Sequence, residues 1–311
     1  GVMAGCRPQY MPVLVALAEA MADPGYGVEH SGNTPGAETL ITINGPIIKD
    51  LEFNYEQGAL RDGFQANTSI GRWWRLYLRN VAGFLPHQTD KGTFGNTWRV
   101  VLAENEDVLA KIDWPPHAAD FGHARGDNAV TISRFTGGDV IASVFGQKPE
   151  DMLPYLADAL ISQTGWQLIF TVGMADGSYT PLLVLSPILA ETMAKAGWSK
   201  DDVRQWLFEN ARIPAKKFEQ YITEYTNFYA GGRSMFELAQ LGKANELYGE
   251  SQDPDRLVPL VCDARDIQIC VSGDPGRTNA QVFSHNGILG FPTARAIRLP
   301  NDWKNKLAGA E

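Results

Sequence analysis

The sequence contains few of the residues that usually mark a disulfide framework, a metal site or a cofactor site. Its 311 residues include three cysteines, Cys6, Cys262 and Cys270, and five histidines. An odd cysteine count without Cys-x-x-Cys spacing argues against disulfides and a zinc knuckle, and it fits a reducing compartment. Neither a phosphate-binding loop nor a dinucleotide fingerprint is visible, so no cofactor is predicted.

Positive charge and long apolar runs are also scarce. The chain has 27 Lys and Arg against 36 Asp and Glu, a net charge of −9. Nucleic acid is therefore not an expected partner, because phosphate binding needs a basic surface. No apolar run is long enough to span a bilayer and no signal-peptide pattern is seen, so we expect no membrane association and a cytoplasmic location.

Strand and helix patterns alternate along the chain, which predicts an α/β fold with mixed or mostly parallel sheets flanked by helices. A strand is expected at residues 39–43 and an amphipathic helix at 70–82. The pattern restarts near residue 149, which predicts two related halves, 1–148 and 149–311, that meet at a cleft. The second half carries a helical insertion at about 199–250. Further strands are predicted at 98–103, 130–135, 140–145, 167–172, 181–185 and 266–271.

The opening run, residues 2–21, is the first candidate for chemistry. It predicts a short buried strand, a tight Gly-Cys turn and a helix whose first turn carries two prolines. This places Cys6 at a helix N-terminus beside Arg7, where the helix dipole and the guanidinium should make the thiol ionise more readily. The alternative is that Cys6 is a small buried hydrophobe.

Four polar loops follow predicted strands, and in a parallel sheet they would converge at one edge. They are residues 5–7, 44–46, 104–105 and 272–279. The last loop contains glycines that let backbone N–H groups approach an oxyanion, and an arginine that can donate two hydrogen bonds. We therefore predict an anion cradle formed by Gly273, Gly276, Arg277 and Thr278, with a plain Gly-rich turn as the alternative.

Two further groups could move protons or hold an anion. His285 lies in a flexible, glycine-bounded segment, where it could act as general acid or base with Asn286 or Asn44 as the orienting amide. The alternative is a solvated turn histidine. Arg72, in the first turn of the helix after Asn67, either faces solvent or points into the cleft.

The acidic and histidine-containing segments that follow residue 103 carry the candidate metal ligands. The stretch 113–128 predicts a surface loop that could act as a lid. His117 and His123 do not have the i, i+4 spacing of a helical ligand pair, so no metal site is predicted. The candidate ligands are Glu104, Glu106, Asp107, His117, Asp120 and His123.

Several blocks resemble the large domain of the UGSC-type (seleno)protein family, which is poorly characterised and bacterial. They are residues 2–13, 44–46, 66–72 and 103–106. The resemblance covers most of residues 1–107 and implies thiol-based chemistry. The family's Sec/Cys-Gly-Ser-Cys motif and a Trp-Thr-Asp-Gly-Leu-Pro segment are absent here. We expect them either upstream of Gly1 or on a separate subunit, which makes a homo- or hetero-oligomer an expected state.

The sequence thus predicts a thiol-dependent enzyme for a small polar or anionic substrate, with Cys6, Glu104 and His285 as catalytic residues. One alternative is a non-catalytic scaffold subunit of a hetero-oligomeric enzyme, and another is a metal-dependent hydrolase or lyase. The residues expected to bind substrate are Arg7, Asn44, Asn67, Arg72, Asn105, Gly273, Gly276, Arg277, Thr278 and Asn286.

Overall fold

The computed structural model describes residues 1–96, 98–164, 177–221, 224 and 233–308. The strand predicted at 167–172 lies outside these residues. The main sheet has seven strands in the order β2-β1-β3-β8-β4-β7, with β9 also paired to β3. Its strands are β1 (Glu38–Asn44), β2 (Leu102–Ala103), β3 (Ala129–Ile141), β4 (Leu182–Leu185), β7 (Gln268–Val271), β8 (Ala280–His285) and β9 (Thr293–Ala296).

The sheet is mixed, as predicted. β1 and β2 are parallel, and so are β4 and β7, whereas β3 runs antiparallel to β1, β8 and β9. A second sheet pairs β5 (Arg212–Pro214) with β6 (Leu257–Pro259). The α/β class is therefore confirmed. The strands of the main sheet come from both predicted halves, so residues 148 and 149 do not divide it.

Two of the edge strands of the main sheet, β2 and β7, meet. The backbone N–H of Asn105 donates to Val271 O at 2.7 Å, and Ser272 Oγ donates to Ala103 O at 2.7 Å. The sheet therefore curls on itself, as a strongly twisted sheet can. The enclosed face holds an apolar cluster drawn from six strands and one loop residue: Leu40, Ala59, Leu102, Phe135, Leu182, Val184, Cys270 and Phe283.

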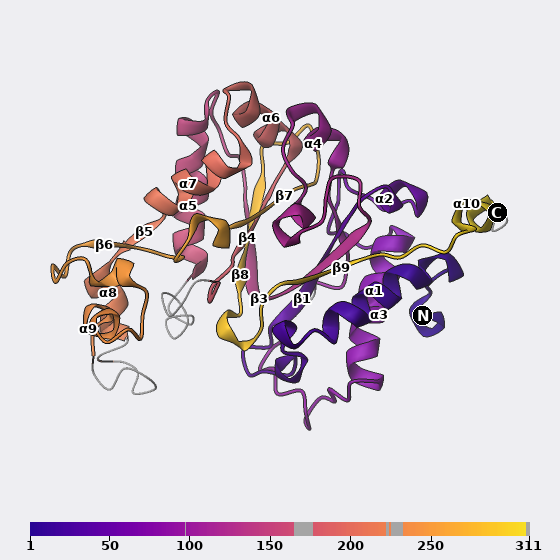
Figure 1. Cartoon of the computed structure of the whole chain (residues 1–311), viewed down its shortest axis with the longest axis horizontal. Helices are drawn as coiled ribbons and strands as arrows, with labels where there is room; N and C mark the ends of the chain where they lie inside the picture. Colours follow the sequence, from indigo (N-terminus) through magenta and orange to yellow (C-terminus); the bar gives the residue numbers. More distant parts are fainter. Residues whose placement is uncertain (97, 165–176, 222–223, 225–232, 309–311) are drawn as a thin grey trace.

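Helices cover the outer face of this sheet in two groups (Figure 1). A first apolar cluster packs α1 and α3 against β1 and β3, and a second packs α4 to α7 against β4, β7 and β8. None of the helices in the described part of the chain is long and apolar enough to cross a membrane. The helices are α1 (Met11–Met21), α2 (Ile47–Asp50), α3 (Gln65–Asn80), α4 (Glu106–Ile112), α5 (Pro149–Thr164), α6 (Pro187–Lys195), α7 (Lys200–Asn210), α8 (Ala215–Gln220), α9 (Met235–Gln240) and α10 (Trp303–Ala308).

Strand β1 shows how the sequence pattern sets the two faces. Ile41 and Ile43 point to the outer cluster with α1 and α3, whereas Leu40 belongs to the enclosed cluster. This is the two-residue alternation of a strand. Polar Thr42 and Asn44 share the enclosed face and are buried, so their hydroxyl and amide groups need partners inside the molecule.

The expected strand at the start of the chain is wrong. Residues Val2–Ala4 and Pro8–Tyr10 form short 3₁₀ helices, and α1 begins at Met11. Val2 and Met3, which supplied the strand pattern, are 93 % and 74 % exposed. The strands predicted at 130–135 and 140–145 are not separate, because β3 continues through Gly137 and Gly138 to Ile141 with a bulge after Phe135.

Candidate functional site

Three of the four predicted loops come together where β1, β2 and β7 end. Asn44 is the last residue of β1, and Glu104 directly follows β2, whose Ala103 pairs with Ile43. Asn44 Nδ2 donates to Glu104 Oε2 at 2.6 Å. The 272–279 loop joins them through the bonds from Ser272 and Asn105 across the β2/β7 junction. The loop at residues 5–7 does not belong here, because no strand precedes it.

Glu104 is the centre of this junction. Its side chain is 1 % exposed and accepts three hydrogen bonds from three separate segments. Oε2 accepts from Asn44 Nδ2 and from His117 N, both at 2.6 Å, and Oε1 accepts from Val271 N at 3.0 Å. Burial raises the pKa of Glu104 above its ordinary value, while the charge of Lys200 and these donors act in the opposite direction.

A cavity of about 280 Å³ lies beside Glu104. Glu104, Glu106 and Asp107 supply its carboxylates, and Lys49 and Arg125 supply its cations, so the acidic groups exceed the basic ones. Tyr55 closes one side, where its hydroxyl donates to Asp107 Oδ2 at 3.2 Å. Glu106 Oε1 accepts from Gly45 N and from Asn44 Nδ2. Asn44 therefore holds two carboxylates of the cavity in place.

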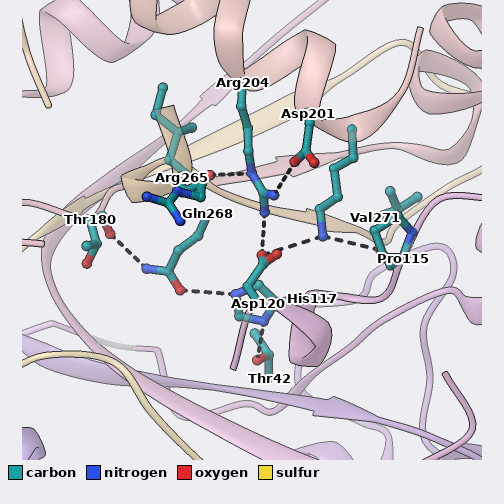
Figure 2. Close-up of polar contacts among 12 residues, drawn as sticks. Thr42, Pro115, His117, Asp120, Thr180, Asp201, Arg204, Arg265, Gln268 and Val271 are labelled. Atoms are coloured by element: carbon teal, nitrogen blue, oxygen red, sulfur yellow. Dashed lines mark hydrogen bonds and ion pairs between the residues drawn. The ribbon is translucent and has the colours of Figure 1, made fainter. Parts of the chain in front are cut away.

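A chain of hydrogen bonds behind Glu104 fixes the proton on His117 (Figure 2). Gln268 Nε2 donates to Thr180 O at 2.8 Å, so Gln268 Oε1 is the atom that faces His117 Nε2 at 3.0 Å. An amide oxygen only accepts, so His117 carries its proton on Nε2 and accepts from Thr42 Oγ1 through Nδ1. Burial lowers the pKa of His117 to about 4, which keeps the ring neutral.

This burial corrects the prediction that residues 113–128 form a surface loop or lid. His117 is 1 % exposed and belongs to a short 3₁₀ helix, His117–Phe121. The same helix carries Asp120, which pairs with Arg204 and lies 3.7 Å from Lys200 Nζ (Figure 2). Lys200 is 1 % exposed, although its place in the first turn of α7 gives no sign of burial.

The prediction of an activated Cys6 is wrong in its physical basis. The α-helix begins at Met11, and the N-cap of the 3₁₀ helix that precedes it, Pro8–Tyr10, is Arg7, so Cys6 does not cap the helix. Cys6 Sγ donates to Ser69 O at 3.4 Å, and partial burial raises its pKa instead of lowering it. Of the other thiols, Cys270 is fully buried, and burial and the charge of Glu104 raise its pKa well above the ordinary value.

His285 is the last residue of β8 and is fully buried, so the expected flexible segment is also corrected. Its Nδ1 accepts from Thr180 N at 3.3 Å and from Gly287 N at 3.2 Å. Burial lowers the pKa of His285 to about 3. The ring is neutral with its Nδ1 lone pair occupied, which makes it a poor proton acceptor. Neighbouring Asn286 is buried and donates its backbone N–H to Arg134 O.

Two of the predicted substrate-binding amides form hydrogen bonds within the fold. Asn67 accepts from Asn54 N and donates to the carbonyls of Asn54 and Val101. Asn105 caps α4 by accepting from Val108 N. Both side chains hold backbone segments together, which leaves no polar atom for a ligand at Asn67.

The predicted anion cradle is not formed by the backbone of the 272–279 loop. The N–H of Gly273 donates to Tyr55 O, that of Gly276 to Asp274 Oδ1, and that of Arg277 to Asp274 O. These donors are used inside the protein, so they cannot bind an anion. Thr278 accepts from Val144 N through its carbonyl.

The other arginines predicted to bind an anionic substrate lie away from the β2/β7 junction. Arg72 is exposed on α3, and Arg7 is half exposed and lies 3.6 Å from Glu52. Within the ranges that the structure describes, no three His, Cys, Asp or Glu side chains are grouped to hold a metal ion. Sequence reasoning did not find Thr42, Gln268, Lys200 and Arg204, because their burial depends on partners far along the chain.

A scan against protein-family models and a search of curated proteins both give no match for this sequence.

Proposed function

We propose that this protein is an enzyme that transfers a proton to or from a small polar substrate bound beside Glu104. The observation that carries the proposal is a carboxyl group that is almost completely buried and still borders a cavity. Buried carboxyl groups are costly and cluster at catalytic sites, where a raised pKa suits general acid–base chemistry.

The surrounding groups support this role by holding Glu104 in one orientation. Donors from β1, the His117 helix and β7 fix both carboxyl oxygens. A rigid frame of this kind reduces the reorganisation that proton transfer requires. Asn44 acts as a positioning residue, since it donates to both Glu104 and Glu106. The cavity is small and its wall is mostly apolar, with charged groups from Glu104, Glu106, Asp107, Lys49 and Arg125. This favours a substrate of a few heavy atoms that carries a hydroxyl, carbonyl or amino group.

The experiment is a solvent-exchange screen. Small hydroxy acids, oxo acids and amino acids are incubated with the protein in D₂O, and proton NMR follows deuterium entry at carbon. The wild type is expected to exchange at least one class, and Glu104→Gln is expected to lose this activity by about 100-fold or more, the range of one general base. Glu209→Gln, an exposed glutamate on α7, is the matched control and keeps full activity.

A second variant tests the cavity without disturbing the bonds of Glu104. Ala110 is exposed on α4 at the rim of the cavity, so Ala110→Trp fills the space while leaving the fold intact. Loss of exchange with an unchanged melting temperature supports the site. Full activity in Ala110→Trp, or exchange that survives in Glu104→Gln, overturns the proposal.

A further inference from the structure

A second cavity opens on the other side of the β2/β7 junction, where the parallel strands β4 and β7 end. Its volume is about 210 Å³. The apolar part is lined by Leu60, Leu102 and Val184, of which Leu102 and Val184 belong to the enclosed cluster of the sheet. The polar part is formed by Ser186 and by the 272–279 loop.

Ser186 is unusual for a residue at the start of a helix. It is the N-cap of α6, a helix of nine residues, yet its hydroxyl makes no capping bond. The N–H of Leu189 donates to the Ser186 carbonyl instead. The hydroxyl is buried, with the residue 5 % exposed, and has no hydrogen-bond partner among the described residues. A buried hydroxyl without a partner costs about 1–3 kcal/mol, so a ligand atom at this position would relieve that cost.

The electrostatics of the polar part favour an anion. The positive end of the α6 dipole lies beside Ser186. Pro187 has no N–H, and Leu189 and Ala190 donate to Ser186 O, so Ile188 N–H is the first-turn donor without a partner among the described residues. Arg277 and Asp274 both line the rim, so one positive and one negative side chain are present. The Asp274 carboxylate accepts from Gly276 N at 2.8 Å, which ties one of its oxygens to its own loop.

We propose that this cavity binds a small monocarboxylate with a short apolar chain. The carboxylate accepts from Ser186 Oγ and from Ile188 N–H in the first turn of α6, Arg277 provides the countercharge, and the chain lies against Leu60, Leu102 and Val184. The cavity is separate from the one beside Glu104, so this inference does not depend on the proposed function. It also differs from the backbone cradle that the sequence predicted, because the donors are a helix end and a serine.

The test is a titration of the ¹⁵N-labelled full chain with butyrate, hexanoate, neutral butyramide and inorganic phosphate. Butyrate or hexanoate is expected to shift the amide signals of Ile188 and Leu189 with a Kd of about 1 mM or tighter, a value suited to a ligand of this size. Butyramide and phosphate are expected to bind at least tenfold more weakly than butyrate, because butyramide lacks the negative charge and phosphate lacks the apolar chain.

Three variants assign the site. Ser186→Ala is expected to weaken butyrate binding about tenfold, the effect of one hydrogen bond to a charged group. Arg277→Gln, at an exposed position, is expected to weaken it severalfold and to reduce its dependence on salt. Asp274→Asn is expected to strengthen it, because a like charge is removed. Exposed Ser251→Ala and Arg79→Gln are matched controls that keep the wild-type Kd.

Absence of a shift at α6 with all four probes overturns the proposal, and so does a Kd unchanged in both Ser186→Ala and Arg277→Gln. Phosphate that binds more tightly than hexanoate overturns it as well, since the apolar wall would then have no role. Each of these three results leaves the exchange experiment on Glu104 unaffected, so the two proposals fail separately.

Discussion

Cys6 shows how strongly a few residues of local geometry decide the chemistry of a side chain. A helix beginning at residue 7 would have placed the thiol at a positive dipole end, whereas the 3₁₀ turns before Met11 leave it against the Ser69 carbonyl. A thiol that donates to a carbonyl is stabilised in its neutral form. The side chain is partly exposed, so reagents can reach it.

We therefore expect Cys6 to react slowly. Its alkylation by iodoacetamide at pH 7.5 should be slower than that of N-acetylcysteine and should increase with pH beyond the ordinary thiol pKa, because burial raises the pKa of Cys6. Mass spectrometry of the native protein resolves the three cysteines. Cys262 and Cys270, which are buried, should react only after unfolding. A Cys6 that reacts faster than the free thiol would restore the thiol-dependent enzyme.

At the scale of one element, α3 carries a glycine where helix propensity argues against one. The structure explains it, because a Cβ on Gly71 would lie 2.2 Å from the Arg99 carbonyl oxygen and 2.7 Å from Val100 N. The helix thus packs directly on the 99–101 backbone, where Asn67 also binds the Val101 carbonyl.

Gly71→Ala should therefore destabilise the protein. Alanine gains about 1 kcal/mol in helix propensity, but forcing a methyl group into this contact costs about 1–3 kcal/mol or more, since backbone must move. Urea unfolding measures the difference. Arg72→Ala, the next residue on the exposed side of α3, is the control and should change stability by less than about 0.5 kcal/mol. A Gly71→Ala protein more stable than the wild type contradicts this packing.

The elements that could be predicted from the sequence are those with a clear local pattern. The apolar stripe of Ile70, Trp73, Trp74 and Leu78 predicts α3, and two short apolar runs predict β1 and β7. The meeting of Asn44, Glu104 and the 272–279 loop also followed from the position of each after a strand. The partners of His117 could not be predicted, because Gln268 lies 151 residues away in the chain.

At the scale of the whole molecule, two buried neutral histidines make stability depend on pH. The folded pKa of His117 is lowered to about 4 and that of His285 to about 3, whereas both titrate near 6.5 when the chain unfolds. Below pH 6.5 the unfolded chain therefore binds more protons than the native protein. Stability is greatest above pH 6.5 and falls as the pH drops toward 4.

We expect His117 alone to lower the free energy of unfolding by about 2 kcal/mol between pH 7.5 and pH 5. In His117→Gln that part of the loss should disappear, even if the variant is less stable at neutral pH. Urea unfolding at both pH values measures the two differences, and His30→Gln, at an exposed position, is the control. Identical pH dependence in the wild type and His117→Gln would show that His117 titrates equally in both states.

The junction between β2 and β7 has a consequence for how the chain is made. Glu104 and Val271, which bond across it, are separated by 167 residues. While the ribosome is still adding residues before 271, β2 has one neighbour and an uncovered edge, and the polar groups of Glu104 lack one of their anchors. Exposed strand edges pair readily with other chains. The nascent protein should therefore need protection from aggregation until translation has passed β7, and its assembly should be slow for its size because the closing contact is so distant.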